Sequence, residues 1–169
     1  MVDNVESGSL GAGPTSWPFV SDLGRWRIAN VPIPKTHLAA VLGALAMDFA
    51  GGRSRHAKRP AQRIVGAATA ALGITLAGWA VAAAEQVDMT HPGRLVTGGP
   101  YAISRNPMYV AWHVLYGGLL IFTGSRWMLR LLPAVLVATH LVIRSEERQL
   151  RRDFGGEFAR YCSVVGRYL

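Results

Sequence analysis

The stretch IVGAATAALGITLAGWAVAAA, residues 64–84, decides the fold class of this chain. It has no charged side chain, and about 20 apolar residues are enough for a helix to cross a hydrocarbon layer of about 30 Å. Three shorter apolar stretches occupy residues 36–51, 108–124 and 127–143. A soluble helical bundle would need charged faces along these stretches, and they have none. We therefore predict an all-α polytopic membrane protein with about four transmembrane helices.

Two details qualify these helices. The stretch 36–51 contains Asp48 and is the weakest of the four, which is typical of a tilted or shallow helix. Within 64–84, small residues recur at four-residue spacing, which lets helix backbones approach closely in lipid. Plain alanine-rich filler explains the same pattern equally well. The two rows of this spacing are Gly66, Ala70, Ile74 and Gly78, and then Gly73 and Ala77.

Charge also favours a membrane protein. The 169 residues suit one domain, half of them are apolar, and the formal net charge is +8. The basic residues border the apolar stretches, as topology-setting loops do. A nucleic-acid binder would instead interleave its arginines with stacking aromatic residues. The lone Cys162 excludes an intrachain disulfide and a CxxC metal site, and we predict no metal centre.

The chain divides into a polar tail and a membrane domain. Residues 1–30 lack the basic start and apolar core of a signal peptide, so we expect a flexible tail. Residues 31–169 form the predicted single domain, and the segment after residue 143 is expected to be helical and interfacial. Only Ser125 and Arg126 separate the last two apolar stretches, which predicts a tight antiparallel hairpin. The polar segments 99–107 and 144–169 should therefore lie on one membrane side.

Orientation rests on two opposing observations. With four spans, the side that carries both termini collects more Lys and Arg, which favours a cytoplasmic location in the cell membrane. The basic loop GGRSRHAKRPAQR, residues 51–63, lies on the other side and argues against it. We predict that the termini and the functional site are cytoplasmic.

The segments that flank the hairpin have plain explanations when each is taken alone. Arg105, Asn106 and Pro107 can simply start a helix, with Asn as the cap and Pro at the first position. Glu146 and Glu147 stand at the membrane exit, where a buried carboxylate is costly without a cation. A solvated helix end, with Glu147 paired to Arg151 at helical spacing, explains them as well.

Together the two segments are more specific. LVTGGPYAISRNPMY (95–109), the hairpin, and EERQLRRDFGGEFARYCSVVGRYL (146–169) make the chain similar to a known family. Over residues 91–169 it resembles the isoprenylcysteine carboxyl methyltransferases and their phospholipid-methyltransferase relatives. Asn106 stands where that pattern commonly has His; it keeps a donor and an acceptor but cannot carry a charge. The first half of the chain matches only as generic helices.

This resemblance implies an integral membrane methyltransferase that uses S-adenosyl-L-methionine. By resemblance, Glu146 would accept a hydrogen bond from the cofactor ammonium, with Glu147 as a nearby second choice. The last segment would close over the cofactor as a lid; the alternative is an amphipathic helix that lies on anionic lipid, and the two are compatible. The residues implied on the cofactor side are Leu95, Val96, Tyr101, Arg105, Asn106, Pro107, Met108 and Tyr109, and those of the lid are Phe154, Tyr161 and Arg167.

The acceptor side is less defined. His113 shares a helix face with Tyr109, while His140 and Arg144 share a face of the next helix, so these are the candidate catalytic residues. An ionised carboxylate acceptor needs no base, whereas an amine, phenol or thiol would need His113 or His140. Alternatively, the histidines only join helices and Arg144 is a snorkelling anchor.

We predict a lipophilic or lipid-attached acceptor that arrives from the bilayer, with a water-soluble acceptor as the alternative. The competing function is a non-enzymatic four-helix membrane protein, such as a transporter subunit or scaffold. The sequence leaves the oligomeric state open.

Overall fold

The computed structural model describes residues 27–28, 31–32, 35–51, 59–85 and 95–169. The chain divides into two compact units, Met1–Ile33 and Pro34–Leu169. In the first unit, β1 (Arg27–Ile28) pairs antiparallel with β2 (Val31–Pro32), with Arg27 opposite Pro32. Most of the predicted polar tail, residues 1–26 and 29–30, lies outside the described residues.

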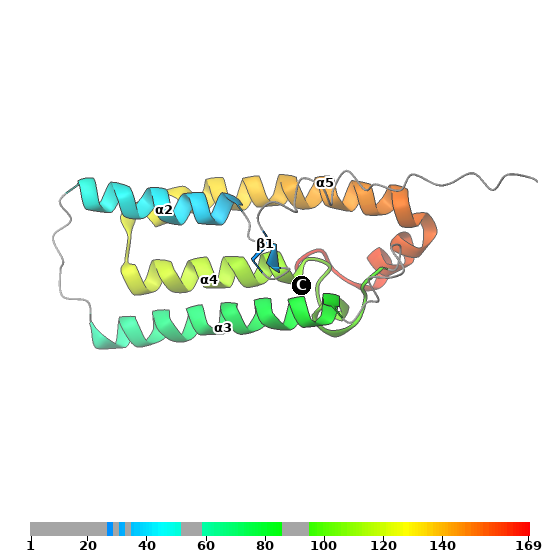
Figure 1. The fold of residues 1–169 in the computed structure, drawn as a ribbon, viewed down its shortest axis with the longest axis horizontal. Coiled ribbons are helices and arrows are strands. Elements are labelled where there is room, and N and C mark those ends of the chain that lie inside the picture. The colour runs from blue at the N-terminus through cyan, green and yellow to red at the C-terminus, as the bar shows by residue number, and fades with distance from the viewer. Residues whose placement is uncertain (1–26, 29–30, 33–34, 52–58, 86–94) are drawn as a thin grey trace, which may run out of the picture. The chain divides into compact units, whose positions relative to one another are not determined.

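The second unit is helical. It contains α2 (Lys35–Ala50), α3 (Pro60–Glu85), α4 (Pro107–Thr123) and α5 (Arg126–Val164), with a short 3-10 helix, η2 (Gly99–Ala102). All four apolar stretches are helical, so the all-α prediction is confirmed for this unit. Within it, α3 runs beside α4 and α2 runs beside α5 (Figure 1).

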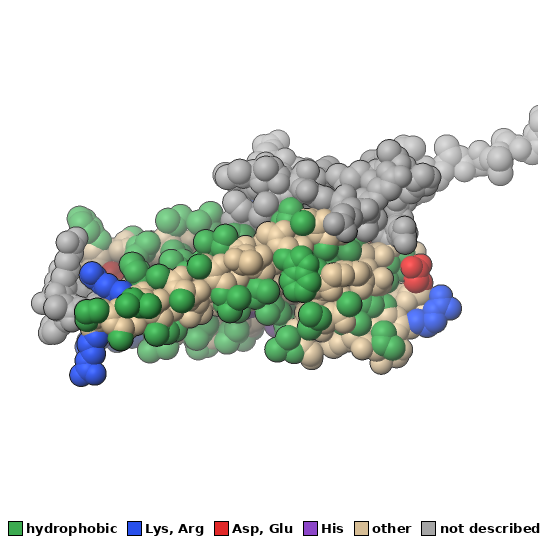
Figure 2. Space-filling model, turned by 90° about the horizontal axis from the view of Figure 1, so that it is seen from below, with side chains coloured by type: hydrophobic (Ala, Val, Ile, Leu, Met, Phe, Trp, Pro, Cys, Tyr) green, Lys and Arg blue, Asp and Glu red, His purple; other side chains and the backbone are tan. Residues whose placement is uncertain are grey.

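Two of these helices are long and apolar enough to cross a membrane among the residues described, namely Pro60–Ala84 and α5. The apolar part of α5 is 127–143. The 17 residues of α4 and the 16 of α2 would extend about 25 Å at 1.5 Å per residue, slightly less than the hydrocarbon thickness. Hydrophobic side chains are spread along the face seen in Figure 2, and charged side chains lie near its two ends. By length and composition, two helices of the described residues are therefore candidate membrane spans. The prediction of four transmembrane helices is not confirmed.

Small residues make the α3–α4 contact. A Cβ added to Gly66 or Gly73 would overlap the backbone of Phe122 or Leu115, and one added to Gly118 would overlap Ala70. Such close backbone contact is what small residues permit in membrane helices. Gly78 has open space around it and takes no part. The contact face of α3 therefore includes residues of both predicted rows, and the first row leaves the contact before Gly78.

The hairpin is one residue earlier than predicted. Gly124 has a left-handed conformation (φ 55°), which ends α4, and the link consists of Gly124 and Ser125. The Ser125 side chain accepts a hydrogen bond from the Met128 amide at 3.1 Å and caps α5. Across the hairpin, the Tyr116 hydroxyl donates to the Met128 carbonyl at 2.8 Å. This antiparallel arrangement brings the start of α4 to the part of α5 that follows its apolar stretch.

The last part of the chain folds back. Gly155 breaks the helical geometry of α5 with φ 47° and ψ −115°, a conformation that suits glycine. After this bend the chain returns to the segment before α4, where the Arg105 amide donates to the Gly166 carbonyl at 2.9 Å. Ser104 and Gly166 also form an isolated parallel bridge. The C-terminal residues are therefore anchored beside the start of α4.

Candidate functional site

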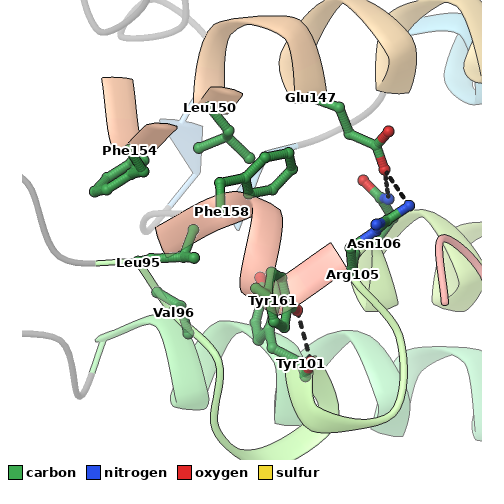
Figure 3. Close-up of a pocket in the computed structure, with 10 residues that line it drawn as sticks. All are labelled: Leu95, Val96, Tyr101, Arg105, Asn106, Glu147, Leu150, Phe154, Phe158 and Tyr161. Atoms are coloured by element: carbon green, nitrogen blue, oxygen red, sulfur yellow. Dashed lines mark hydrogen bonds and ion pairs between the residues drawn. The ribbon is translucent and has the colours of Figure 1, made fainter. Parts of the chain in front are cut away.

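A cavity of about 240 Å³ lies where η2, the start of α4 and the end of α5 meet (Figure 3). One end of it is apolar and aromatic, and the other end is polar. Six of its lining residues were predicted for the cofactor side: Leu95, Val96, Tyr101, Arg105, Asn106 and Glu147. The other four are Leu150, Phe154, Phe158 and Tyr161.

The polar end is built around Glu147, whose side chain is about 10% exposed. Arg167 binds one carboxylate oxygen through two nitrogens, at 3.0 and 2.7 Å. Arg105 lies 3.3 Å from the other oxygen, and the Asn106 amide donates to it at 3.4 Å. Burial would raise the pKa of Glu147, but the Arg167 hydrogen bond and the two guanidinium charges outweigh it and hold the pKa low. Glu147 is therefore a paired, ionised carboxylate.

These contacts test two details of the plain explanations, the cap by Asn106 and the pair of Glu147 with Arg151. Asn106 stands at the N-cap of α4 and Pro107 in its first turn, but the Asn106 side chain makes no capping bond. It donates to Glu147 and to the Arg167 carbonyl instead, at 3.4 and 3.1 Å. Capping by the Asn106 side chain is therefore wrong. The partners of Glu147 are Arg105 and Arg167, and Arg151 is exposed on α5.

Glu146 has different surroundings. The Tyr109 hydroxyl donates to one of its carboxylate oxygens at 2.7 Å. Burial raises the pKa of Glu146, and the hydrogen bond from Tyr109 only partly opposes this. Neither residue lines the cavity. Glu146 thus keeps hydrogen-bonding capacity that Glu147 has already used.

The aromatic end comes largely from the returning tail. Phe158 is buried, and it packs with Leu95, Tyr161 and Val165. The Tyr161 hydroxyl donates to the Tyr101 carbonyl at 2.6 Å, which ties the tail to η2. Burial raises the pKa of Tyr161 to about 12, so the phenol is uncharged at neutral pH. Cys162 is half-buried against the same cluster.

Sequence reasoning missed two of the lining residues, Leu150 and Phe158. Together with the predicted Phe154 they recur every four residues in the sequence, a helical spacing that could have indicated them. Phe154, Tyr161 and Arg167, predicted for a closing segment, all lie at the cavity or bind its polar end. Met108, also predicted, is buried in α4 and is not a lining residue.

The candidate catalytic residues have different surroundings. His113 contacts the Tyr109 carbonyl through Nδ1 at 2.7 Å, one turn deeper in α4 than the site. His140 lies 2.7 Å from the Tyr168 hydroxyl, and Arg144 is exposed. The buried stripe of α5 contains Thr139 and Ile143, so Arg144 is on a different face.

A further histidine was overlooked by sequence reasoning. His37 is 4% exposed, and its ring centroid is 4.7 Å from that of His113. It precedes Ala44, the buried residue of α2, by seven positions, so both lie on one helix face. This spacing could have indicated an inward-facing residue.

One of three comparisons with known proteins found a match. The family model described as phospholipid methyltransferase matches residues 61–157. The match covers more than half of the chain, from the start of α3 to just beyond the Gly155 bend. The matched region therefore begins about thirty residues before residues 91–169, over which the sequence analysis found the resemblance to methyltransferases. Searches of curated proteins and of solved structures found no significant match.

Proposed function

The chain belongs to the phospholipid methyltransferase family, and we propose that it is an integral membrane methyltransferase that uses S-adenosyl-L-methionine to methylate a lipophilic or lipid-attached acceptor. The observation that carries this proposal is the meeting of two segments across the hairpin. Residues 105–109 contact Glu146 and Glu147 beside a cavity of about 240 Å³. A non-enzymatic scaffold does not require paired polar segments beside a cavity, and membership of the family favours an enzyme.

The residues present fit S-adenosyl-L-methionine. Its adenosine part suits the aromatic end of the cavity, with Leu95, Val96 and Tyr101 joined by Phe158. Its ammonium suits Glu146, whose carboxylate Tyr109 occupies only in part. Its carboxylate suits Arg105, whose Nε is buried and has no hydrogen-bond partner within the described segments. When bound, the cofactor supplies an electrophilic methyl group on a sulfonium.

Glu147 has a supporting role in this proposal. Its charge is already matched by Arg105 and Arg167, so it fixes the guanidinium of Arg105 and anchors the tail. Met108 and Pro107 hold the first turn of α4, where free backbone amides favour an anionic group. The tail contributes Phe158 and Tyr161 to the cavity wall, and charge interactions are stronger where such a wall displaces water.

On the acceptor side, we propose His113 as the proton acceptor for a nucleophile that needs one. A carbonyl oxygen only accepts hydrogen bonds, so the contact with the Tyr109 carbonyl requires the proton on Nδ1. Nε2 of the neutral ring then carries the lone pair, and this atom has no hydrogen-bond partner among the residues described. His140 and Arg144 stay secondary candidates, since His140 contacts Tyr168 and Arg144 is exposed.

In the proposed topology, α2 to α5 all cross the cell membrane and the site lies on the cytoplasmic side with both termini. The exposed apolar side chains of α2 to α5 support contact with lipid, among them Leu42 and Phe49 on α2. We propose that the acceptor enters from the bilayer between the helices.

The decisive experiment uses purified full-length protein in detergent. Isothermal titration with S-adenosyl-L-methionine should show saturable binding. Incubation with cofactor that carries a tritiated methyl group, in vesicles of a total lipid extract, should then label the lipid fraction. Absence of binding would overturn the cofactor assignment. Label confined to water-soluble compounds would overturn the lipophilic acceptor.

A further inference from the structure

Two histidines lie together between α2 and α4. The ring centroids of His37 and His113 are 4.7 Å apart, with the ring planes at 78°, and His37 also packs edge-on against Tyr116. His37 is 4% exposed, and its Nδ1 lies 3.4 Å from the Thr36 hydroxyl. Placing polar groups in such surroundings is unfavourable unless they form hydrogen bonds.

Those hydrogen bonds are incomplete. Nε2 of His37 and Nε2 of His113 are both buried, and neither has a partner in the described part of the chain. The Thr139 hydroxyl on the buried stripe of α5 shares this condition. Buried side-chain polar atoms in native proteins rarely lack a hydrogen-bond partner. Two neighbouring rings that both lack one at Nε2 therefore indicate a place where a bound group could form these bonds.

Tyr109 connects the pair to the cofactor side of the site. Its hydroxyl donates to Glu146 at 2.7 Å, and its carbonyl accepts from His113 at 2.7 Å. The four residues from Tyr109 to His113 correspond to a rise of about 6 Å along the helix. The two imidazoles therefore lie about one turn deeper in the bundle than the carboxylate proposed for the cofactor ammonium.

We propose that His37 and His113 together bind the reacting group of the acceptor, a proposal that rests on the methyltransferase function above. The Nε2 lone pair of His113 accepts the proton of that group. The N–H or O–H bond of the acceptor breaks, its electron pair stays on the nucleophile, and an Nε2–H bond forms. His37 forms a second hydrogen bond to the same group through its own Nε2 and orients it. The pair therefore selects acceptors that donate a hydrogen bond.

The first test needs no turnover. Full-length protein with ¹⁵N-labelled histidine is placed in nanodiscs of dioleoylphosphatidylcholine alone, or with added phosphatidylethanolamine or phosphatidylglycerol. The choline headgroup has no N–H or O–H, whereas the other two do. The Nε2 resonances of His37 and His113, assigned with His37→Phe and His113→Phe, should move with at least one of the two donor lipids. Identical spectra in all three lipids would overturn the proposal.

The second test separates hydrogen bonding from packing. His37→Phe keeps a ring against His113 but loses the nitrogen, and should weaken binding of the responsive lipid about tenfold, as expected for one lost hydrogen bond. His37→Gln keeps a hydrogen-bonding group and should stay within about threefold of wild type. The reverse ranking would make His37 a packing residue only.

A matched control is Thr75→Val on α3. The Thr75 hydroxyl donates to the Ala71 carbonyl of its own helix, so this variant should bind as wild type does. Titration of S-adenosyl-L-methionine runs in parallel. Unchanged cofactor binding in His37→Phe supports an acceptor-side role, and an equal loss overturns it. Wild-type protein that binds no cofactor would refute the proposed function, whereas the histidine resonances would still report on this site.

Discussion

Glu146 and Glu147 are neighbours on one turn of α5, yet their surroundings differ. Glu147 is bound by Arg105, Asn106 and Arg167, which leaves little capacity for a ligand. Glu146 has the Tyr109 hydroxyl as its partner and lies one residue closer to the apolar part of the helix. In the proposed function this difference gives the two residues separate roles: Glu147 anchors the tail through its ion pairs, and Glu146 is the proposed ligand of the cofactor ammonium.

The largest effect is expected at Glu147. In Glu147→Gln the guanidinium groups of Arg105 and Arg167 lose their counter-charge, and removing one partner of a buried ion pair costs about 3–5 kcal/mol. Because the Arg167 side chain is 35% exposed, we expect a value near the lower limit. Thermal unfolding in detergent should show a lower midpoint, and trypsin should cleave the tail at Arg160 faster.

The control for this variant is Glu157→Gln, since Glu157 is exposed on the same helix. It should leave the unfolding midpoint and the tryptic pattern unchanged. Equal behaviour of the two variants would contradict an anchoring role for Glu147.

Glu146→Gln should show the opposite profile. The substitution removes a charge-assisted hydrogen bond to the cofactor ammonium, which is worth about 1.5–3 kcal/mol, or more than tenfold in affinity. The unfolding midpoint should change little, because Glu146 forms no ion pair with the residues that the structure describes. Calorimetric titration of S-adenosyl-L-methionine measures the affinity, and an affinity equal to wild type would place the ammonium elsewhere.

Glu146 and Glu147 should become protonated at different pH values. The pKa of Glu147 is lowered, so its stabilising contribution is complete above about pH 4.5 and is lost only as the pH falls through the lowered value. The pKa of Glu146 is raised, so it loses its charge at a higher pH. As pH decreases from neutral, cofactor affinity should fall first and tail anchoring second. Both are measurable in one pH series, and the reverse order would contradict the assignment.

The smallest effect is expected for Tyr109→Phe. This change removes one hydrogen bond to Glu146, so cofactor affinity should fall by about threefold to tenfold. The Tyr109 hydrogen bond also lowers the pKa of Glu146, so the acid limit of cofactor binding should move to higher pH in the variant. An unchanged acid limit would show that Tyr109 does not tune Glu146.

The hydrophobic pattern of the sequence was enough to predict the helices. It also predicted that the segment before α4 lies close to the segment that follows the apolar part of α5. The apolar stretches gave α2 to α5, and the two-residue link forced the start of α4 toward Glu146. The choice of partners was beyond sequence reasoning. Whether Asn106 caps α4 or binds Glu147 depends on where the tail returns, and that depends on the backbone conformation of Gly155.

His37 was missed for a related reason. The stretch 36–51 reads as a generic apolar helix, and its inward face is defined only by the helices against which it packs. The small-residue rows of α3 had the same ambiguity, since Gly73 meets α4 while Gly78 meets nothing. Periodicity identifies a face, but the neighbouring helix determines which face is used.

The returning tail also has a consequence for the order of folding. The Ser104 hydroxyl donates to the Arg167 carbonyl across 63 positions, whereas Tyr116 and Met128, which join across the hairpin, are 12 positions apart. Contacts between distant positions require a larger loop-closure entropy before they contribute stability. The hairpin should therefore form early and the cavity late. A chain with all its helices in place can thus still lack a competent site, and hydrogen exchange should find the tail amides opening well before those of α4.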